Sequence, residues 1–173
     1  MDVTIRLPQE SDLPAYTDLL QQTYADAYTN DAIGLTKEVF SQKIFNAPNT
    51  QKYLASNLVI NENQKTWLAF IDDEMVGSIT ISDKGNECEL RGFYVKTKYQ
   101  GEGIGRKLWR LALEFSGQKD IVLDSYTHNT KTIEMYKKWG FVIDTAKGEF
   151  YRHWLEWPDG LQAKCLYMRL KRG

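Results

Sequence analysis

Three glycines fall within five residues in the segment Tyr99-Gln-Gly-Glu-Gly-Ile-Gly105, directly before a run of helically spaced apolar residues. Each glycine at a helix start costs up to about 1 kcal/mol relative to alanine, so this concentration suggests a use. Without Cβ atoms, the backbone can bring several free N–H groups against an anion, and the helix dipole adds favourable charge there. The spacing therefore predicts a cradle for a diphosphate, with a plain strand-to-helix turn as the alternative.

Positive charge gathers around the same loop. Residues 96–110 carry five basic side chains and one acid, Glu102, in a chain whose formal net charge is -1. The basic residues are Lys96, Lys98, Arg106, Lys107 and Arg110. This local excess favours an anionic ligand, although a solvated helix face would have the same composition. Arg106 stands where both the dinucleotide-binding pattern and the Walker pattern require glycine, so neither motif is present.

The chain has too few histidines and cysteines for a metal site or a disulfide framework. The chain holds His128, His153, Cys88 and Cys165, with no CxxC pair and no metal-ligand spacing, so we expect no metal. A covalent route with Cys88 as nucleophile and His128 as base stays an alternative, but nothing in the sequence brings the two together.

A wider pattern surrounds the glycine loop. Leu90 and Phe93-Tyr-Val95 precede it, Gln100-x-x-Gly103-x-Gly105 forms it, and Asn129 with Tyr136-Lys-Lys-Trp-Gly-Phe141 follows downstream. This combination resembles the GCN5-related N-acetyltransferase (GNAT) superfamily over essentially the whole chain. The Thr23-Tyr24-x3-Tyr28 segment makes it similar in pattern to the bacterial polyamine-acetylating (Pai-type) members.

The resemblance implies acetyl-CoA as the acetyl donor. The strand carrying Phe93 and Val95 would splay from its parallel neighbour, and its free backbone groups would pair with the pantetheine arm. Asn129 would hydrogen-bond the pantetheine amide, or would only cap its helix, and the two roles are compatible. The diphosphate would be held by the glycine loop, through Gln100, Gly101, Gly103, Ile104, Gly105 and Arg106.

The resemblance also implies a direct transfer of the acetyl group to a primary amine in a ternary complex. Tyr136 would donate a proton to the departing thiolate, unless it is an ordinary core tyrosine. The Val95 N–H would polarise the acetyl carbonyl. Glu89 is the leading candidate for the general base, with a water chain as the alternative and His128 as a lesser candidate.

Strand alternation predicts that Glu89, Arg91, Phe93 and Val95 share one face of their strand. Exposure of Glu89 at the start of the strand, without any catalytic role, is the alternative.

The N-terminal segment suggests what the acceptor is. Residues 1–31 carry six acids against Arg6 alone. The resemblance implies that the first helices line the acceptor side. The acids are Asp2, Glu10, Asp12, Asp18, Asp26 and Asp31. They would attract a small cationic amine such as a polyamine, and Tyr24 and Tyr28 would offer ring faces to its ammonium. The alternatives are a solvated acidic helix face, a protein or peptide amine as acceptor, and an acyl-CoA sensor without turnover.

The periodicity of apolar residues predicts the elements that must position these side chains. Strands are expected at residues 3–7, 66–71, 75–81, 87–95, 120–124, 141–145 and 162–170. Helices are expected after Ser11 or Asp12 and at residues 36–46, 49–57, 104–115 and 129–139. The strand–helix–strand passage from 87 to 124 implies a parallel crossover in an otherwise antiparallel sheet.

Together with the resemblance, these elements imply an α+β GNAT fold. Its central sheet is mixed and mostly antiparallel, with about seven strands and a splayed parallel pair, and helices flank both faces.

Length and composition set the broad class. The chain has 173 residues, 42% of them hydrophobic and 26% charged, which predicts a single folded domain. The resemblance implies that this is one N-acetyltransferase domain over residues 1–173. The near-neutral charge argues against a nucleic-acid partner, and the longest apolar run, residues 67–71, is too short to span a membrane. With no signal-peptide character at its start, we expect a cytoplasmic protein. The oligomeric state is left open, a homodimer included.

Overall fold

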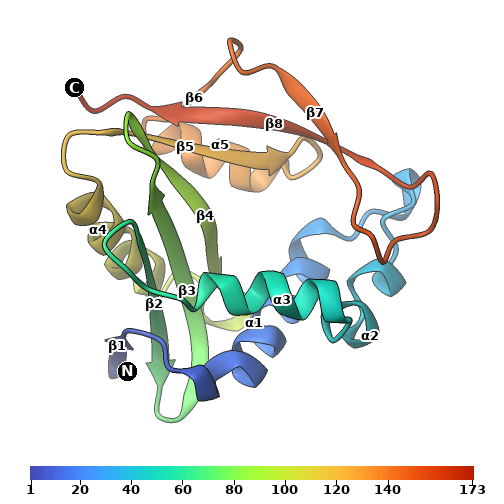
Figure 1. The fold of residues 1–173 in the computed structure, drawn as a ribbon, viewed down its shortest axis with the longest axis horizontal. Coiled ribbons are helices and arrows are strands. Elements are labelled where there is room, and N and C mark those ends of the chain that lie inside the picture. Colours follow the sequence, from blue (N-terminus) through green and yellow to red (C-terminus); the bar gives the residue numbers. More distant parts are fainter.

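The computed structural model describes residues 1–173, in which a strand and three helices precede a three-stranded meander, a crossover helix and the closing strands (Figure 1). The strands are β1 (Val3–Arg6), β2 (Gln64–Ile71), β3 (Glu74–Asp83), β4 (Glu87–Val95), β5 (Asp120–Tyr126), β6 (Val142–Ile143), β7 (Glu149–Arg152) and β8 (Ala163–Leu170). The helices are α1 (Leu13–Tyr28), α2 (Gln42–Phe45), α3 (Pro48–Asn57), α4 (Ile104–Ser116) and α5 (Thr130–Lys138).

The strands form one mixed sheet in the order β1-β2-β3-β4-β5-β8-β6, and β7 also pairs with β8. Only β4 and β5 are parallel, and α4 is the crossover between them. All other pairs are antiparallel. The predicted α+β fold with one parallel pair is confirmed, with eight strands where about seven were expected.

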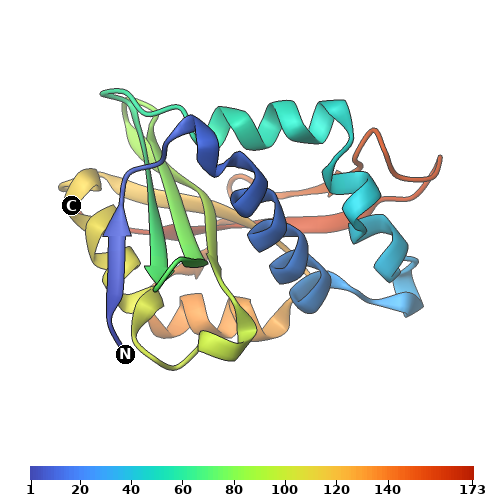
Figure 2. The same cartoon turned by 90° about the horizontal axis from the view of Figure 1, so that it is seen from below.

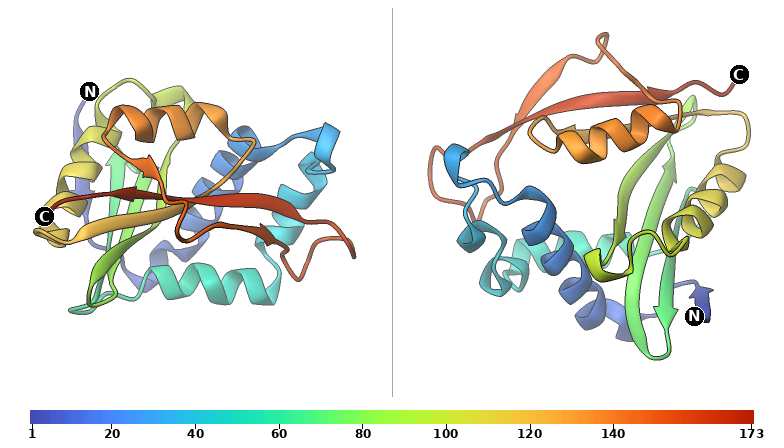
Figure 3. Two further views of the ribbon diagram at one scale, coloured as in Figure 1. Left: turned by 90° about the horizontal axis from the view of Figure 1, so that it is seen from above. Right: turned by 180° about the vertical axis from the view of Figure 1, so that it is seen from behind.

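Helices cover both faces of the sheet, as expected. Leu108 of α4 and Ile133 of α5 are buried on one face together with Ile79 of β3. Leu20 of α1 and Leu54 of α3 are buried on the other face. Figures 2 and 3 show α3 and α5 on opposite sides of β8. No helix in the chain is both long and apolar enough to cross a bilayer.

The segment 36–46 is not one helix, contrary to the prediction. A 3-10 turn at Lys37–Phe40 and the short α2 are separated at Ser41, whose backbone is extended (φ -75°, ψ 163°). Phe40 and Phe45 are both almost fully buried, at 0% and 1% exposure. In a continuous helix, residues five apart point about 140° from each other. The break at Ser41 allows both rings to enter the same core.

The C-terminal strands also differ from the prediction. The expected strand at 141–145 is reduced to the two residues of β6, and β7 was not foreseen. Both elements pair with the same edge of β8, one after the other along its length. Since β8 is long enough to hold two partners, the chain between α5 and β8 forms two short strands separated by a turn at Gly148 (φ +74°).

Arg169 of β8 ties together the elements that meet where β4 and β5 begin. Its guanidinium lies 2.7 Å from Glu87 at the start of β4, 3.1 Å from Asp120 at the start of β5 and 2.9 Å from Asp144 after β6. Burial raises the pKa of Glu87 and of Asp144, but hydrogen bonds to Lys147 and Arg169 outweigh it, and both pKa values lie below their ordinary range. The carboxylates are therefore stabilised in their charged form.

We expect Arg169→Met to lower the free energy of unfolding by about 1–3 kcal/mol, a value reduced for partial solvent screening, because three carboxylates lose their shared cation. Groups with a lowered folded-state pKa stabilise above their unfolded pKa and lose that contribution as the pH falls through the folded value. Stability of the wild type should therefore fall between about pH 5 and pH 3 more steeply than that of the variant. Urea unfolding at several pH values measures both effects.

The matched control is Lys164→Met, which breaks the exposed pair between Lys164 and Glu149. It should leave the unfolding midpoint nearly unchanged. Equal losses in the two variants would show that Arg169 acts as an ordinary surface residue.

Candidate active site

The parallel strands β4 and β5 pair over only three residues. Their register runs from Glu87 opposite Asp120 to Glu89 opposite Val122 and then stops. Beyond this point β4 continues along β3 as far as Val95, and β5 continues along β8 as far as Tyr126. Figure 1 shows the result, with β2, β3 and β4 diverging from β5 and β8. The expected splay is present, and it leaves the facing backbone groups of the two strands without strand partners.

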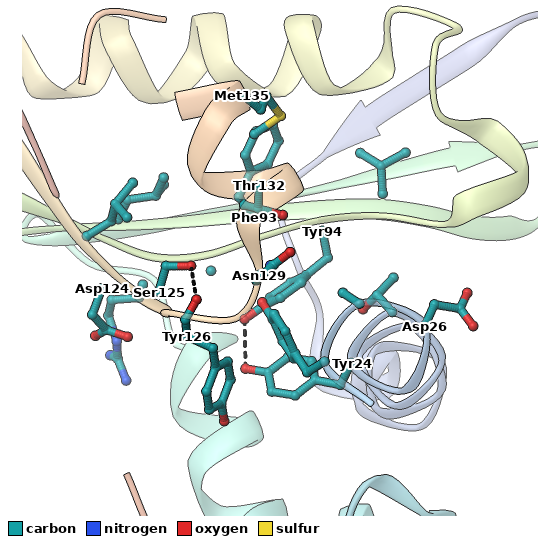
Figure 4. A pocket seen from close by; sticks show the side chains of 18 of the residues that line it. Tyr24, Asp26, Phe93, Tyr94, Asp124, Ser125, Tyr126, Asn129, Thr132 and Met135 are labelled. Carbon is teal, nitrogen blue, oxygen red and sulfur yellow. Dashed lines mark hydrogen bonds between the residues drawn. The ribbon is translucent and has the colours of Figure 1, made fainter. Parts of the chain in front are cut away.

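A cavity of about 1140 Å³ opens in this splay. It is lined by β4 and β5, by the glycine loop, by the first turns of α5, by α1 and α3, and by the loop between β7 and β8. In Figure 4, Asn129 lies between Phe93, Thr132 and Met135 on one side and Tyr24 and Tyr126 on the other.

Twelve of the thirteen predicted site residues line this cavity. They are Tyr24, Tyr28, Glu89, Phe93, Val95, Gln100, Gly101, Gly103, Gly105, Arg106, Asn129 and Tyr136. Ile104 does not: its side chain is 1% exposed and packs in the core beside Gly77. Only the backbone N–H of Ile104 can therefore contribute to binding.

The glycine loop presents a run of free backbone donors. None of the N–H groups of residues 101–106 donates a hydrogen bond within the protein, and the first bond of α4 runs from Lys107 N to Gly103 O. Gly101 and Gly103 have φ values of +87° and +83°, and a Cβ at either position would point into open space. Six consecutive donors, in the loop and in the first turn of the helix that follows it, have the geometry of an anion-binding cradle.

Gly105 has a different role. A Cβ there would lie 3.3 Å from the ring of Phe93, so glycine at this position allows α4 to approach β4 closely. The side chain of Gln100 turns back to the strand, where its amide Nε2 donates to the Val95 carbonyl at 3.1 Å. Gln100 thereby fixes the loop to the end of β4.

The positive charge near the loop is smaller than the sequence suggests. Lys96 and Lys98 lie 2.8 and 3.1 Å from Glu74 in the β2–β3 hairpin. Hydrogen bonds from Lys96, Tyr99 and Lys98 lower the pKa of Glu74 to about 2, so it is ionised and offsets them. Lys107 and Arg110 line a separate groove next to Trp67. Of the five basic residues, Arg106 alone lines the cavity.

Tyr136 projects from α5 into the cavity and is 6% exposed. Its ring packs edge-on against Trp139 and Phe141, with centroids 6.1 and 5.2 Å away. No protein group hydrogen-bonds its hydroxyl, and burial raises its pKa, so the hydroxyl keeps its proton at neutral pH. A buried, protonated and unpaired hydroxyl can act as a proton donor.

Glu89 lies at the point where β4 and β5 separate, but not on the predicted face. A β-bulge occurs in β4 at Arg91, because Leu90 pairs with Ile81 and Gly92 pairs with Thr80. Glu89 pairs laterally with Ser82 on the α3 side of the sheet, while the Phe93 ring faces α4.

The prediction that Glu89, Arg91, Phe93 and Val95 share a face is therefore wrong, since the bulge reverses the alternation between Arg91 and Phe93. Glu89 still reaches the cavity, and its side chain is 41% exposed, 3.8 Å from Lys84.

Asn129 precedes α5 but does not cap it with its side chain. The residue is 8% exposed and lines the cavity, and its side-chain amide makes no hydrogen bond within the protein. The amide is therefore free to bind a ligand, whereas the role of a simple N-cap is not observed.

Aromatic rings form the end of the cavity next to α1. The Tyr24 hydroxyl lies 2.8 Å from that of Tyr94, and the Tyr24 ring packs against Tyr28 at 4.9 Å and Trp154 at 5.6 Å. Of the six N-terminal acids, Asp26 alone lines the cavity, and Asp12 instead forms an ion pair with Arg6. The end of the cavity at which the acceptor was expected is thus more aromatic and less acidic than predicted.

Cys88 and His128 do not meet. Cys88 is buried in the core at 1% exposure, outside the cavity lining, and burial raises its pKa. The Nε2 atom of His128 is 2.9 Å from the carbonyl oxygen of Tyr28. The covalent alternative therefore lacks both a thiolate and a base next to it.

Several lining residues were missed in the sequence. Tyr94, Lys131, Trp154 and Glu156 line the cavity, and none was singled out. For Trp154 and Glu156, the sequence offers one indication. Two tryptophans, Trp154 and Trp157, lie close together in a segment without strand or helix periodicity.

Comparison with known proteins finds similar proteins that are named as acetyltransferases. N-alpha-acetyltransferase RimI of Mycobacterium tuberculosis is 33% identical over 82 residues, 45% of this chain and 52% of that protein. The chain thus spans about half the length of this curated relative. Spermidine N(1)-acetyltransferase of Thermoplasma acidophilum is 23% identical over 154 residues, 86% of the chain and 93% of that protein.

A similar solved structure is the PaiA N-acetyltransferase of Thermoplasma acidophilum in complex with coenzyme A. It is 23% identical, with a TM-score of 0.62, and the alignment covers 99% of each chain. The acetyltransferase (GNAT) family model matches residues 19–141. This match contains the splay, the glycine loop and Tyr136, and it covers well over half of the chain. The resemblance seen in the sequence is confirmed: the protein belongs to the acetyltransferase (GNAT) family.

Proposed function

We propose that the protein is an acetyl-CoA-dependent N-acetyltransferase that transfers the acetyl group directly to a primary amine in a ternary complex. One observation carries this proposal: a single cavity connects the donor-rich glycine loop, the unpaired edges of β4 and β5 and the aromatic end beside α1. Both substrates can therefore be bound at once, which direct transfer requires.

The donor half of the cavity fits acetyl-CoA. The N–H groups of residues 101–106 and the side chain of Arg106 would hold the diphosphate. The open edge of β4 near Phe93 and Val95 and the free amide of Asn129 would hold the pantetheine arm. When bound, acetyl-CoA supplies an activated acyl carbon and a thiolate leaving group.

Three groups of the chain would then act on the reaction. Glu89, directly or through a water chain, takes the proton that the attacking amine must lose as its nitrogen bonds to the acetyl carbon. The Val95 N–H donates to the acetyl oxygen as negative charge develops there. Tyr136 gives its proton to the sulfur as the carbon–sulfur bond breaks.

The acceptor is a small cationic amine such as a polyamine. The aromatic end around Tyr24 and Tyr28 supports this choice, and so does the carboxylate of Asp26, which accepts a hydrogen bond from Thr97 but has no cationic partner in the protein. The similarity to a spermidine acetyltransferase over 86% of the chain supports it as well. A protein or peptide amine is the second candidate, favoured by the similarity to RimI. An acyl-CoA sensor without turnover is disfavoured by the free Tyr136 hydroxyl, which lines the same cavity as the glycine loop.

An amine panel incubated with acetyl-CoA, with free thiol measured as product, tests the activity and the acceptor together. At saturating acetyl-CoA, kcat/KM for spermidine should exceed that for neutral amines of similar length. It should fall severalfold between about 0.01 M and about 1 M salt, where the Debye length shrinks from about 30 to about 3 Å. A salt-insensitive rate, or a preference for peptide N-termini, would overturn the polyamine proposal and leave the acetyltransferase proposal standing.

A further inference from the structure

The loop between β7 and β8, residues 153–162, carries a side chain that the proposed reaction does not yet use. Trp154 and Trp157 stack within this loop, with ring centroids 5.4 Å apart and an interplanar angle of 12°. Trp157 is 3% exposed, and its Nε1 donates to the Val39 carbonyl at 3.2 Å. The loop is thereby anchored to the segment between α1 and α2.

This anchoring places the loop over the aromatic end of the cavity. The Trp154 ring lies 5.6 Å from Tyr24, 6.0 Å from Phe40 and 5.6 Å from Phe45. Trp154 and Glu156 both line the cavity. The loop therefore adds one aromatic wall and one carboxylate to the end at which the acceptor is proposed to bind.

The Glu156 carboxylate is unusual among the four that line the cavity. Asp124 is paired with Arg152 at 2.7 Å, Glu89 lies near Lys84, and Asp26 accepts a hydrogen bond from Thr97. Glu156 has neither a cation nor a hydrogen-bond donor, and its Oε1 is shielded from solvent. A carboxylate without a cation or a hydrogen-bond donor is unfavourable next to a closed protein surface, and a cation bound in the cavity beside Glu156 would offset its charge.

A second polar atom at this end of the cavity is also buried without a hydrogen-bond partner. The Tyr126 hydroxyl is buried without a hydrogen-bond partner, and Tyr126 also lines the cavity. A carboxylate and a hydroxyl oxygen are acceptors for N–H groups, and the faces of Tyr and Trp rings attract organic cations. Together these groups fit an alkylammonium better than an anion or a neutral apolar group.

We propose that Glu156 binds a second, non-reacting ammonium of the acceptor, beside Trp154 and within the cavity that Tyr126 lines. This proposal rests on the proposed N-acetyltransferase function. It assigns the specificity of the site to amines with two or more positive charges. One amine must be neutral to attack the acetyl group, and the other stays charged against Glu156.

The test is Glu156→Gln, which keeps the shape of the side chain and removes its charge. KM for spermidine should rise about tenfold with kcat nearly unchanged, equivalent to about 1.4 kcal/mol, close to the value of one hydrogen bond to a charged group. KM for a monoamine of the same length, and the calorimetric affinity for acetyl-CoA, should not change. Calorimetric binding of spermidine to the CoA-saturated protein should weaken by the same factor.

Glu149→Gln is the matched control, because Glu149 lies on the neighbouring strand β7 and pairs with Lys164 outside the cavity. It should leave all these quantities unchanged. If Glu156→Gln does not fold, Tyr126→Phe provides the second variant, with a smaller rise in KM for spermidine only.

Equal effects of Glu156→Gln on monoamines and spermidine, or none on either, would overturn this proposal. Absence of acetyl transfer to every amine by the wild type would instead overturn the proposed function. Even if the wild type acetylates no amine, weaker calorimetric binding of spermidine by Glu156→Gln than by the wild type would support the role of Glu156 in binding an ammonium.

Discussion

Gly103→Asp should abolish acetyl-CoA binding in a protein that remains folded. Gly103 lies in the middle of the six free N–H groups, and a Cβ added there would have no neighbouring atom within 4 Å, so the Cβ of an aspartate meets no steric obstacle. Its carboxylate would place a negative charge where the diphosphate is proposed to bind. We expect the dissociation constant, measured by calorimetry, to rise by more than about 100-fold.

Gly103→Asn is the matched control, because asparagine has nearly the same shape and, like aspartate, tolerates a positive φ. Gly103 has a φ of +83°, so both variants carry the same backbone strain and differ only in charge. The Asn variant should bind within about tenfold of the wild type. Unchanged acetyl-CoA affinity in a folded Asp variant would remove the cradle from the glycine loop.

Tyr136→Phe should lower kcat by about 10² or more while leaving the fold and the affinity for acetyl-CoA intact. The ring keeps its packing against Trp139 and Phe141, and the hydroxyl has no partner in the protein to lose. Only the proton donor is removed. Steady-state kinetics with the best amine of the panel, together with calorimetry of acetyl-CoA binding, measure the two effects separately.

Tyr151→Phe removes the same hydroxyl from a tyrosine that is 60% exposed on β7 and lies outside the cavity. Its kcat should equal that of the wild type. A decrease of less than threefold in the Tyr136 variant would assign Tyr136 to the core and leave the thiolate to be protonated by solvent.

The sequence predicted those parts of the fold that depend on local pattern. The β2–β3 hairpin follows from two apolar runs separated by Asp72 and Asp73, and α4 follows from the spacing of Ile104, Leu108 and Ala112 after the glycine loop. Twelve of the thirteen site residues line one cavity because motif spacing determines which ends of strands and helices carry them.

The features that the sequence did not predict arise from contacts between segments far apart in the chain. The bulge at Arg91 depends on how β4 pairs with β3, which no alternation within β4 reveals. Glu74 offsets Lys96 and Lys98 only because a hairpin turn comes next to the end of β4. Glu156 reaches the cavity because Trp157 is anchored to Val39, 118 residues away in the chain. These contacts join residues that are far apart in the chain. The composition and periodicity of a short segment therefore do not reveal them.

The six free donors of the glycine loop belong to the backbone, and the acceptor end is built from side chains. A backbone donor survives the replacement of its residue, provided that the chain keeps the same conformation. Sequence changes should therefore spare the proposed diphosphate cradle except at Gly101, Gly103 and Gly105, where the dihedral angle or the closeness to Phe93 limits the choice of residue. The acceptor end has no such protection, because a single replacement changes its charge or shape. Under the proposed function, a lineage of such proteins can therefore change its acceptor amine by a few point mutations while its donor stays the same.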